Sequence, residues 1–341
     1  MDKQKQVIHA VAGSGKTSLI IDELSLEKNI AIITYTTSNQ GVIKEKVISK
    51  FGCIPENIHI FGFWQFAYSF CLVPCLTRKP KGIIFDDEIK RANKFRDRKL
   101  AYGVNGYIFD NMISKFLFDE KLPYIERIDE FFYEVYIDEM QDFDSYDFDW
   151  LLSLAKAKTK IWLVGDYYQR TYSTSKSGNK NSAIMKNFSS YKNVFEEAGY
   201  YFNEVLLSNS HRCPPEICTF VSEKIGIKIN SHNEIGDSKI SLVNDKEEIL
   251  SIMLDDSIKK LFYREHYKYC CNSTNWGDSK GQTYEKVCVV LNPESFKLFS
   301  KDKLVEMKPV TKSKFYVACT RSLGDLYFIK QKDIPESIKL S

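Results

Sequence analysis

The sequence contains no apolar run that approaches the roughly 20 residues needed to cross a bilayer. It also has no charged-then-apolar leader segment, no internal repeat and no low-complexity tract. Its nine cysteines include no C-x-x-C pair and its five histidines are dispersed, which argues against a structural zinc site and favours reduced thiols. These absences exclude membrane-spanning, repeat and disulfide-framework proteins, and they predict a cytoplasmic globular protein.

What is present is enough for two ordinary domains, because 341 residues with 43% hydrophobic and 14% aromatic content can bury two cores. The net charge of +3 is small, but basic residues crowd positions 78–99 and acidic residues crowd Asp138 to Asp149. A basic segment is most often a solvated face. A basic segment with interspersed aromatics is also typical of a surface for nucleic acid or an acidic partner.

A glycine-rich turn follows the strand-like run Gln6 to Ala10. Such a turn between a strand and a helix presents backbone N–H groups to a phosphate chain, which Lys16 can reach, and Thr17 can hold Mg²⁺. An alanine opens the loop where the usual pattern has a glycine. The turn predicts a nucleotide site made of Ala12, Gly13, Ser14, Gly15, Lys16 and Thr17.

Strands and helices are expected to alternate along the chain, which predicts parallel sheets with functional loops at one edge. Strands are expected at 29–35, 58–62, 131–137, 160–164, 204–207, 240–243, 287–291 and 326–329. Helices are expected at 18–26, 40–51, from 63, at 147–157, 183–198, from 214 and at 246–262. Residues 73–130 break the alternation and predict a short insertion that is mostly helical toward its end.

The strand at 131–137 delivers Asp138 and Glu139 to the same sheet edge as the glycine-rich turn. There Asp138 can hold Mg²⁺ and Glu139 can polarise an attacking water. An acidic pair after a strand is often exposed charge. After a phosphate-binding loop in an alternating chain, it predicts a hydrolysis site.

The order of these motifs resembles that of superfamily 1 helicases of the UvrD/Rep type. The matching segments are Ala12–Thr17, Thr34–Thr36, Ile137–Asp142, Val164–Gln169 with Tyr172, Leu207–Arg212, Ser279–Tyr284 and Tyr316–Arg321. The resemblance spans nearly the whole chain.

The resemblance implies two RecA-like α/β domains with parallel sheets and an ATP cleft between them. We expect the first domain at 1–202, with its insertion at about 73–130, and the second at 203–341. ATP and Mg²⁺ are the implied cofactors, with Gln169 reading the γ-phosphate. Arg212 and Arg321 are implied to stabilise transferring charge, while His211 and Gly281 are implied to contact the nucleotide.

The resemblance also implies a track for single-stranded nucleic acid, on which bases stack upon aromatic rings. The candidate contacts are Tyr35, Thr36, Phe63, Trp64 and Trp276. Helical spacing gives neighbouring Phe66 and Phe70 a core role instead, and core packing is an equal alternative for Trp64 and Trp276.

Several positions depart from the family pattern. No glutamine precedes the first strand at the usual distance, Ser18 replaces an arginine, and His211 stands where a tyrosine usually stacks on adenine. Tyr172 leads to Ser-Thr rather than to a base-wedging tryptophan, and Thr283 replaces a carboxylate. The long second-domain insertion is also missing, so we expect a compact motor. The changed nucleotide-contacting positions imply relaxed adenine selectivity.

These features favour an ATP-dependent translocase or helicase on single-stranded DNA, moving 3′ to 5′ by resemblance, with a protein partner such as a nuclease or effector subunit. Compact relatives of this type occur in bacterial anti-phage systems. The alternative is a nucleotide-gated regulatory subunit of a defence or repair complex that binds nucleic acid or a partner without processive unwinding. An RNA-directed motor is the weaker third hypothesis.

Overall fold

The computed structural model describes residues 4–93, 102–171 and 180–340. The chain divides into two compact units. The first comprises the described residues of Met1–Ile8, Lys16–Gly165 and Ser173–Asn203, and the second comprises those of His9–Gly15, Asp166–Tyr172 and Glu204–Ser341. Two loops from the first half of the sequence therefore belong to the second unit.

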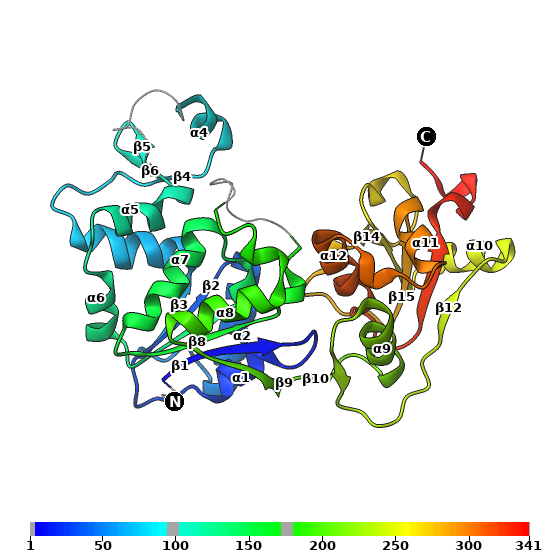
Figure 1. Cartoon of the computed structure of the whole chain (residues 1–341), viewed down its shortest axis with the longest axis horizontal. Helices are drawn as coiled ribbons and strands as arrows, with labels where there is room; N and C mark the ends of the chain where they lie inside the picture. Colours follow the sequence, from blue (N-terminus) through cyan, green and yellow to red (C-terminus); the bar gives the residue numbers. More distant parts are fainter. Residues whose placement is uncertain (1–3, 94–101, 172–179, 341) are drawn as a thin grey trace. The chain divides into compact units, whose positions relative to one another are not determined.

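The main sheet of the first half has six strands in the order β3-β2-β7-β8-β1-β9 (Figure 1). Their bounds are β1 Lys5–Ala10, β2 Ile30–Thr34, β3 Ile58–Gly62, β7 Glu134–Asp138, β8 Lys160–Gly165 and β9 Tyr201–Leu207. Strands β3, β2, β7 and β8 pair in parallel, so their carboxyl ends meet at one edge. Every residue of β1, β2 and β7 is buried, as expected of a parallel sheet covered on both faces.

Eight α-helices of the described residues belong to this half of the chain, and α4, α5 and α6 lie in or at the end of the insertion. Their bounds are α1 Lys16–Asp22, α2 Thr37–Phe51, α3 Phe63–Gln65, α4 Asp87–Asn93, α5 Ile113–Asp119, α6 Tyr124–Phe131, α7 Ser145–Ser153 and α8 Phe188–Ala198. After α3 the chain continues as a π-helical segment, Phe66–Leu72. No helix of the described residues is long and apolar enough to span a membrane.

The insertion is mostly helical toward its end, as the sequence predicts, with α5 and α6 there. It contains a three-stranded sheet, β4-β6-β5, before α5. The strands are β4 Ile83–Ile84, β5 Gly103–Val104 and β6 Tyr107–Phe109. These strands have two or three residues each, which is too short for a period-two pattern to be recognised in the sequence.

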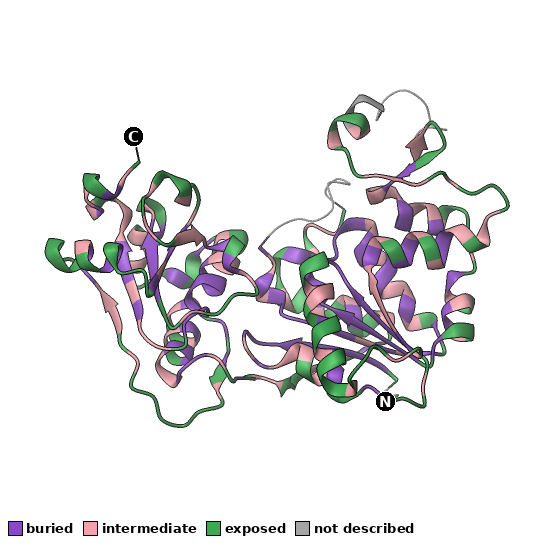
Figure 2. Cartoon of the chain, turned by 180° about the vertical axis from the view of Figure 1, so that it is seen from behind, coloured by how far each residue is buried: buried purple, intermediate pink, exposed green. Residues whose placement is uncertain are grey.

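The second unit carries a five-stranded sheet in the order β12-β16-β15-β13-β14, in which all neighbouring strands are parallel. The strands are β12 Ile240–Leu242, β13 Ile258–Phe262, β14 Ser273–Asn275, β15 Lys286–Leu291 and β16 Leu326–Lys330. Its helices are α9 Pro215–Phe220, α10 Lys246–Leu254, α11 Pro293–Phe299 and α12 Pro309–Cys319. The buried strands lie among helices with exposed outer faces (Figure 2). A separate two-residue parallel pair joins β10 Asn209–Ser210 to β11 Asn230–Ser231.

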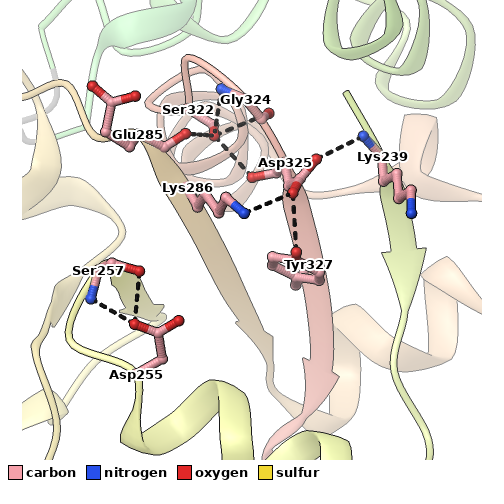
Figure 3. Close-up of polar contacts among 9 residues, drawn as sticks. All are labelled: Lys239, Asp255, Ser257, Glu285, Lys286, Ser322, Gly324, Asp325 and Tyr327. Carbon is pink, nitrogen blue, oxygen red and sulfur yellow. Dashed lines mark hydrogen bonds and ion pairs between the residues drawn. The ribbon is translucent and has the colours of Figure 1, made fainter. Parts of the chain in front are cut away.

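The predicted helix over 246–262 is wrong, because α10 stops at Leu254 and β13 begins at Ile258. Asp255 makes the turn between them. Its carboxylate accepts hydrogen bonds from the backbone N–H of Ser257 at 2.9 Å and from the Ser257 hydroxyl at 2.6 Å (Figure 3). A short polar side chain that bonds the backbone two residues on is a turn signal, and it outweighs the helical spacing.

A polar network links the amino ends of β12, β15 and β16 in the second sheet (Figure 3). The Asp325 carboxylate accepts from the Lys239 backbone at 3.0 Å and from the Tyr327 hydroxyl at 3.1 Å, and it pairs with the Lys286 ammonium at 3.3 Å. Its pKa is lowered, chiefly by the Lys239 hydrogen bond.

Candidate functional site

The glycine-rich turn lies between β1 and α1. Gly13 and Gly15 have φ of 73° and 86°, in the left-handed region that glycine adopts without strain. The Ser14 backbone N–H and hydroxyl both donate to the Val11 carbonyl, at 3.3 and 2.8 Å. The backbone therefore has the alternating conformation that makes anion-binding concavities.

Gly13 also allows the turn after β10 to approach. A Cβ at this position would lie 2.5 Å from the Arg212 Cβ and 2.8 Å from the Ser210 hydroxyl. The His211 backbone N–H donates to the Gly13 carbonyl at 2.9 Å. The structure thus brings the predicted phosphate loop together with two other predicted site residues, His211 and Arg212.

Lys16 and Thr17 are half-buried at the start of α1. Within the described ranges, neither side chain has a hydrogen bond or ion pair with the protein. An ammonium without a carboxylate partner beside a concave, glycine-rich backbone fits a polyphosphate. The chemistry of the loop is therefore consistent with the expected ATP.

The acidic pair lies at the carboxyl end of β7. Asp138 is buried and is in register with Thr34 of β2 and Val164 of β8. Glu139 has φ 56° and ψ 46°, a left-handed conformation that costs a side-chain-bearing residue on the order of 1–3 kcal/mol. Such strain is concentrated at functional sites.

The loop after Glu139 packs against the end of β8. The Gln141 side-chain amide donates to the Glu139 carboxylate. A Cβ on Gly165 would lie 2.2 Å from the Gln141 amide oxygen and 2.7 Å from Met140 Cγ. Gly165 is therefore required for this loop to close on the strand end.

Mg²⁺ would be held here by Asp138 and Thr17, since P-loop enzymes complete the coordination with phosphate oxygens and water. No group of three His, Cys, Asp or Glu side chains able to hold a metal occurs in the described part of the chain. The oxygen donors Asp138 and Thr17 nevertheless fit Mg²⁺ rather than a softer metal.

Asp166, directly after β8, organises the next motif. Its carboxylate accepts from the Tyr168 backbone N–H at 3.0 Å and from the Gln169 side-chain amide at 3.0 Å. The Tyr316 hydroxyl donates to the same Asp166 oxygen as Gln169, at 3.0 Å, and itself accepts from the Ala12 backbone N–H at 2.9 Å. Tyr316 therefore connects the phosphate loop to Gln169 inside the second unit.

The two predicted arginines converge on one backbone segment. Arg212 donates to the Thr320 carbonyl at 3.4 Å, while Arg321 donates to the Thr320 hydroxyl at 3.4 Å and to the Val317 carbonyl at 2.9 Å. Arg321 is only 1% exposed. Burial, and then the neighbouring Arg212, lower the pKa of Arg321 to about 10. An anion placed beside this pair would offset both effects.

The predicted stacking residues are mostly buried. Phe63 and Trp276 are 1% and 0% exposed, and the Trp276 indole N–H donates to the Leu261 carbonyl at 2.8 Å. Tyr35 is 5% exposed, and its ring stacks on Phe63 with centroids 5.5 Å apart. In this conformation Phe63 and Trp276 are core residues that present no face to a base, which departs from the stacking expectation for Phe63 and matches the core-packing alternative for Trp276.

Other nucleic-acid candidates remain accessible. Thr36 is exposed, and its hydroxyl accepts from the Asn39 backbone as the N-cap of α2. Trp64 is half-buried and makes an edge contact with the exposed Phe85 at 5.5 Å. Gly281, a predicted contact of the nucleotide and not of the nucleic acid, is exposed, with φ 83°. Tyr172 and residues 94–99 of the basic segment lie outside the described residues.

Sequence reasoning missed a basic and aromatic cluster after β13. The Arg264 guanidinium lies over the Tyr263 ring at 5.0 Å and the Lys314 ammonium at 5.7 Å. Hydrogen bonding to Thr311, with these cations, lowers the pKa of Tyr263. The usable signal was Tyr-Arg directly after an apolar run, and it was hidden because that run was assigned to a helix.

Comparisons with known proteins bear on part of the sequence and on the fold. Residues 81–190 match the model of the UvrD/REP helicase N-terminal domain, which includes the acidic pair and Gln169. No curated protein matches the chain.

Among solved structures, the chain is similar to the arterivirus nonstructural protein 10 helicase, with 13% identity and a TM-score of 0.51 over 95% of this chain and 59% of that one. The PRRSV helicase is 13% identical to this chain, with a TM-score of 0.50 over 99% of this chain and 55% of that one. The arterivirus helicase in complex with DNA is 14% identical, with a TM-score of 0.51 over 96% of this chain and 61% of that one. The chain thus spans less than two thirds of the length of these helicases and has their fold.

Proposed function

We propose, for a chain that is UvrD-like in sequence over residues 81–190 and helicase-like in fold, that it is an ATP-hydrolysing motor acting on single-stranded DNA. The observation that carries the proposal is the hydrogen-bonded connection from Ala12 through Tyr316 and Asp166 to Gln169. It joins a phosphate loop to a side chain that can respond to the γ-phosphate, which a motor requires and a simple binding module does not.

The residues divide the chemistry among them. Lys16 and the backbone of Gly13 and Gly15 bind the phosphates, and Mg²⁺ held by Thr17 and Asp138 would neutralise charge on the β- and γ-phosphate oxygens. Glu139 orients the attacking water and accepts its proton. Arg212 and Arg321 stabilise the charge that develops on the γ-phosphoryl group, a role worth orders of magnitude in rate.

For nucleic acid, the proposed contacts shift from the buried rings to the accessible ones. Tyr263, Arg264 and Lys314 combine an aromatic face with two cations, which suits the bases and phosphates of a single strand. Trp64 with Phe85 offers a second aromatic surface. DNA is the proposed polymer, as in the solved complex of a similar helicase with DNA, and RNA is an outcome of the test.

The test is the steady-state ATPase rate with and without a homopolymeric DNA or RNA oligonucleotide. We expect stimulation by DNA, and a Glu139→Gln variant that binds ATP but loses at least 100-fold in rate, in the range for removal of a catalytic base. A 3′-to-5′ motor will displace streptavidin from a 5′-biotinylated strand faster than from a 3′-biotinylated one. Hydrolysis that no nucleic acid affects would refute the motor function.

The burial of Phe63 and Trp276 favours one alternative, a nucleotide-gated regulatory subunit, because it leaves fewer stacking faces for a stepping grip. That subunit would bind ATP and a partner such as a nuclease without translocating. Unstimulated hydrolysis, together with partner activity that persists in Glu139→Gln, would support it over the motor.

A further inference from the structure

Tyr316 lies within α12 and is completely buried, five residues before Arg321. Its hydroxyl is both an acceptor and a donor of hydrogen bonds, since it accepts from the Ala12 N–H and donates to an Asp166 carboxylate oxygen. Ala12 and Asp166 are themselves fully buried. Water therefore cannot substitute for either bond without opening the core, so the two bonds fix the Asp166 carboxylate relative to the phosphate loop.

Asp166 in turn fixes the amide of Gln169. The Gln169 Nε2 donates to the same carboxylate oxygen that Tyr316 uses, and the Gln169 backbone N–H donates to the Asp166 carbonyl at 2.9 Å. The other end of the amide, Oε1, accepts no hydrogen bond from any residue that the structure describes. With Nε2 held by a carboxylate, which can only accept, the amide cannot flip without losing that bond.

We propose that Tyr316 is a positioning residue for ATP hydrolysis, which acts through Asp166 to present the Gln169 Oε1, rather than the amide N–H, to the reacting groups. In that orientation Oε1 accepts a hydrogen bond from the attacking water, whereas a flipped amide would present N–H donors to phosphate oxygens. This role rests on the proposed ATPase function. Within that function, the Tyr316 hydroxyl holds the Gln169 amide in the orientation that hydrolysis uses.

Burial supports the donor role of this hydroxyl. Removal from water, together with the nearby Asp166, raises the pKa of Tyr316 well above its ordinary value, so the proton stays on the phenol. The Tyr316 ring also makes an edge contact with Tyr168, whose backbone N–H holds the other Asp166 oxygen. Replacing tyrosine by phenylalanine would keep this packing and remove only the hydroxyl.

The experiment is a double-mutant cycle on the full chain, with kcat and KM for ATP measured in the presence of DNA. Tyr316→Phe should lower kcat roughly tenfold to hundredfold, in the range for a misplaced catalytic group, with KM changed less than about threefold. Gln169→Ala should lower kcat at least as much. The double variant should be no slower than Gln169→Ala alone, because both changes remove the same interaction.

The matched control is Tyr327→Phe, which breaks another tyrosine–aspartate bond of this unit, 3.1 Å from the Tyr327 hydroxyl to Asp325 (Figure 3). It should leave kcat and KM unchanged. A purely structural role for Tyr316 would instead give losses that multiply with Gln169→Ala, and this result would overturn the proposal while leaving the ATPase function intact. A wild-type chain that hydrolyses no ATP would overturn both.

Discussion

Asp147 gives the sharpest test of how the first unit is held together. It lies in α7, is 2% exposed, and accepts from the Ser114 hydroxyl at 2.6 Å and the Tyr35 hydroxyl at 3.3 Å. Burial, which outweighs these hydrogen bonds, raises the pKa of Asp147 from 3.8 to about 7, with Asp110 and Asp144 adding to the effect. The folded chain therefore holds a proton here that the unfolded chain releases.

The direction of the pH effect follows. Between about pH 4 and pH 7 the folded state binds one proton more than the unfolded state, so the free energy of unfolding falls as pH rises through this interval. The difference between the pKa of an ordinary aspartate and a pKa of about 7 corresponds to a change in the free energy of unfolding on the order of 4 kcal/mol. Asp147→Asn mimics the protonated acid, because the hydroxyl beside the new NH2 group can rotate to accept from it while the other hydroxyl still donates to the amide oxygen.

The assay is urea unfolding of wild type and Asp147→Asn at intervals from pH 4 to pH 8, following the transition of the first unit. We expect the two curves to meet near pH 4 and the variant to be more stable above pH 7. Asp149→Asn is the control, because Asp149 lies on the same helix but is partly exposed and paired with Lys180. It should cost less than about 1 kcal/mol and retain the wild-type slope. Parallel wild-type and Asp147→Asn curves would refute the reasoning.

Two further predictions concern the candidate site. Gly165→Ala should destabilise the chain by about 1–3 kcal/mol and slow ATP hydrolysis, because its Cβ would lie 2.7 Å from Met140 Cγ. Gly41→Ala, in a helix with open space around it, should instead be neutral or stabilising in the same thermal melts. His232→Ala should weaken binding of a fluorescent ATP analogue several-fold and leave tripolyphosphate binding unchanged, since the His232 ring lies 4.2 Å from that of His211. Equal losses for both ligands would show that the two rings do not support the base.

The sequence predicted the sheets of both halves because parallel, fully buried strands read as continuous apolar runs. The strand at Ile58–Gly62 has the predicted bounds, and those at 30–34, 160–165 and 286–291 differ by at most a residue or so from prediction. The strand β13 was missed because two lysines interrupt its apolar run. One of them, Lys260, is buried, and its ammonium donates to the Asp255 carbonyl at 2.5 Å across the turn between α10 and β13.

The site was predictable where the chemistry is local and not where it depends on packing. The glycines, Lys16 and the acidic pair follow from residue type and spacing. The burial of Trp276 could not be read from its position, because it depends on contacts with Tyr263 and Phe315 from other elements. The role of Tyr316 was hidden for the same reason, since its partners Ala12 and Asp166 are remote in sequence.

The bond between Ala12 and Tyr316 also bears on how the chain folds. A total of 304 residues separates its two ends, and Val11 and Ala12 belong to the same apolar cluster as Phe315 and Tyr316. Loop closure over such a separation is slow and is completed only after Tyr316 has been synthesised. Until then this cluster stays open, and its exposed apolar surface is a target for chaperones and proteases. A chain interrupted before α12 would leave the phosphate loop attached to an unfinished core.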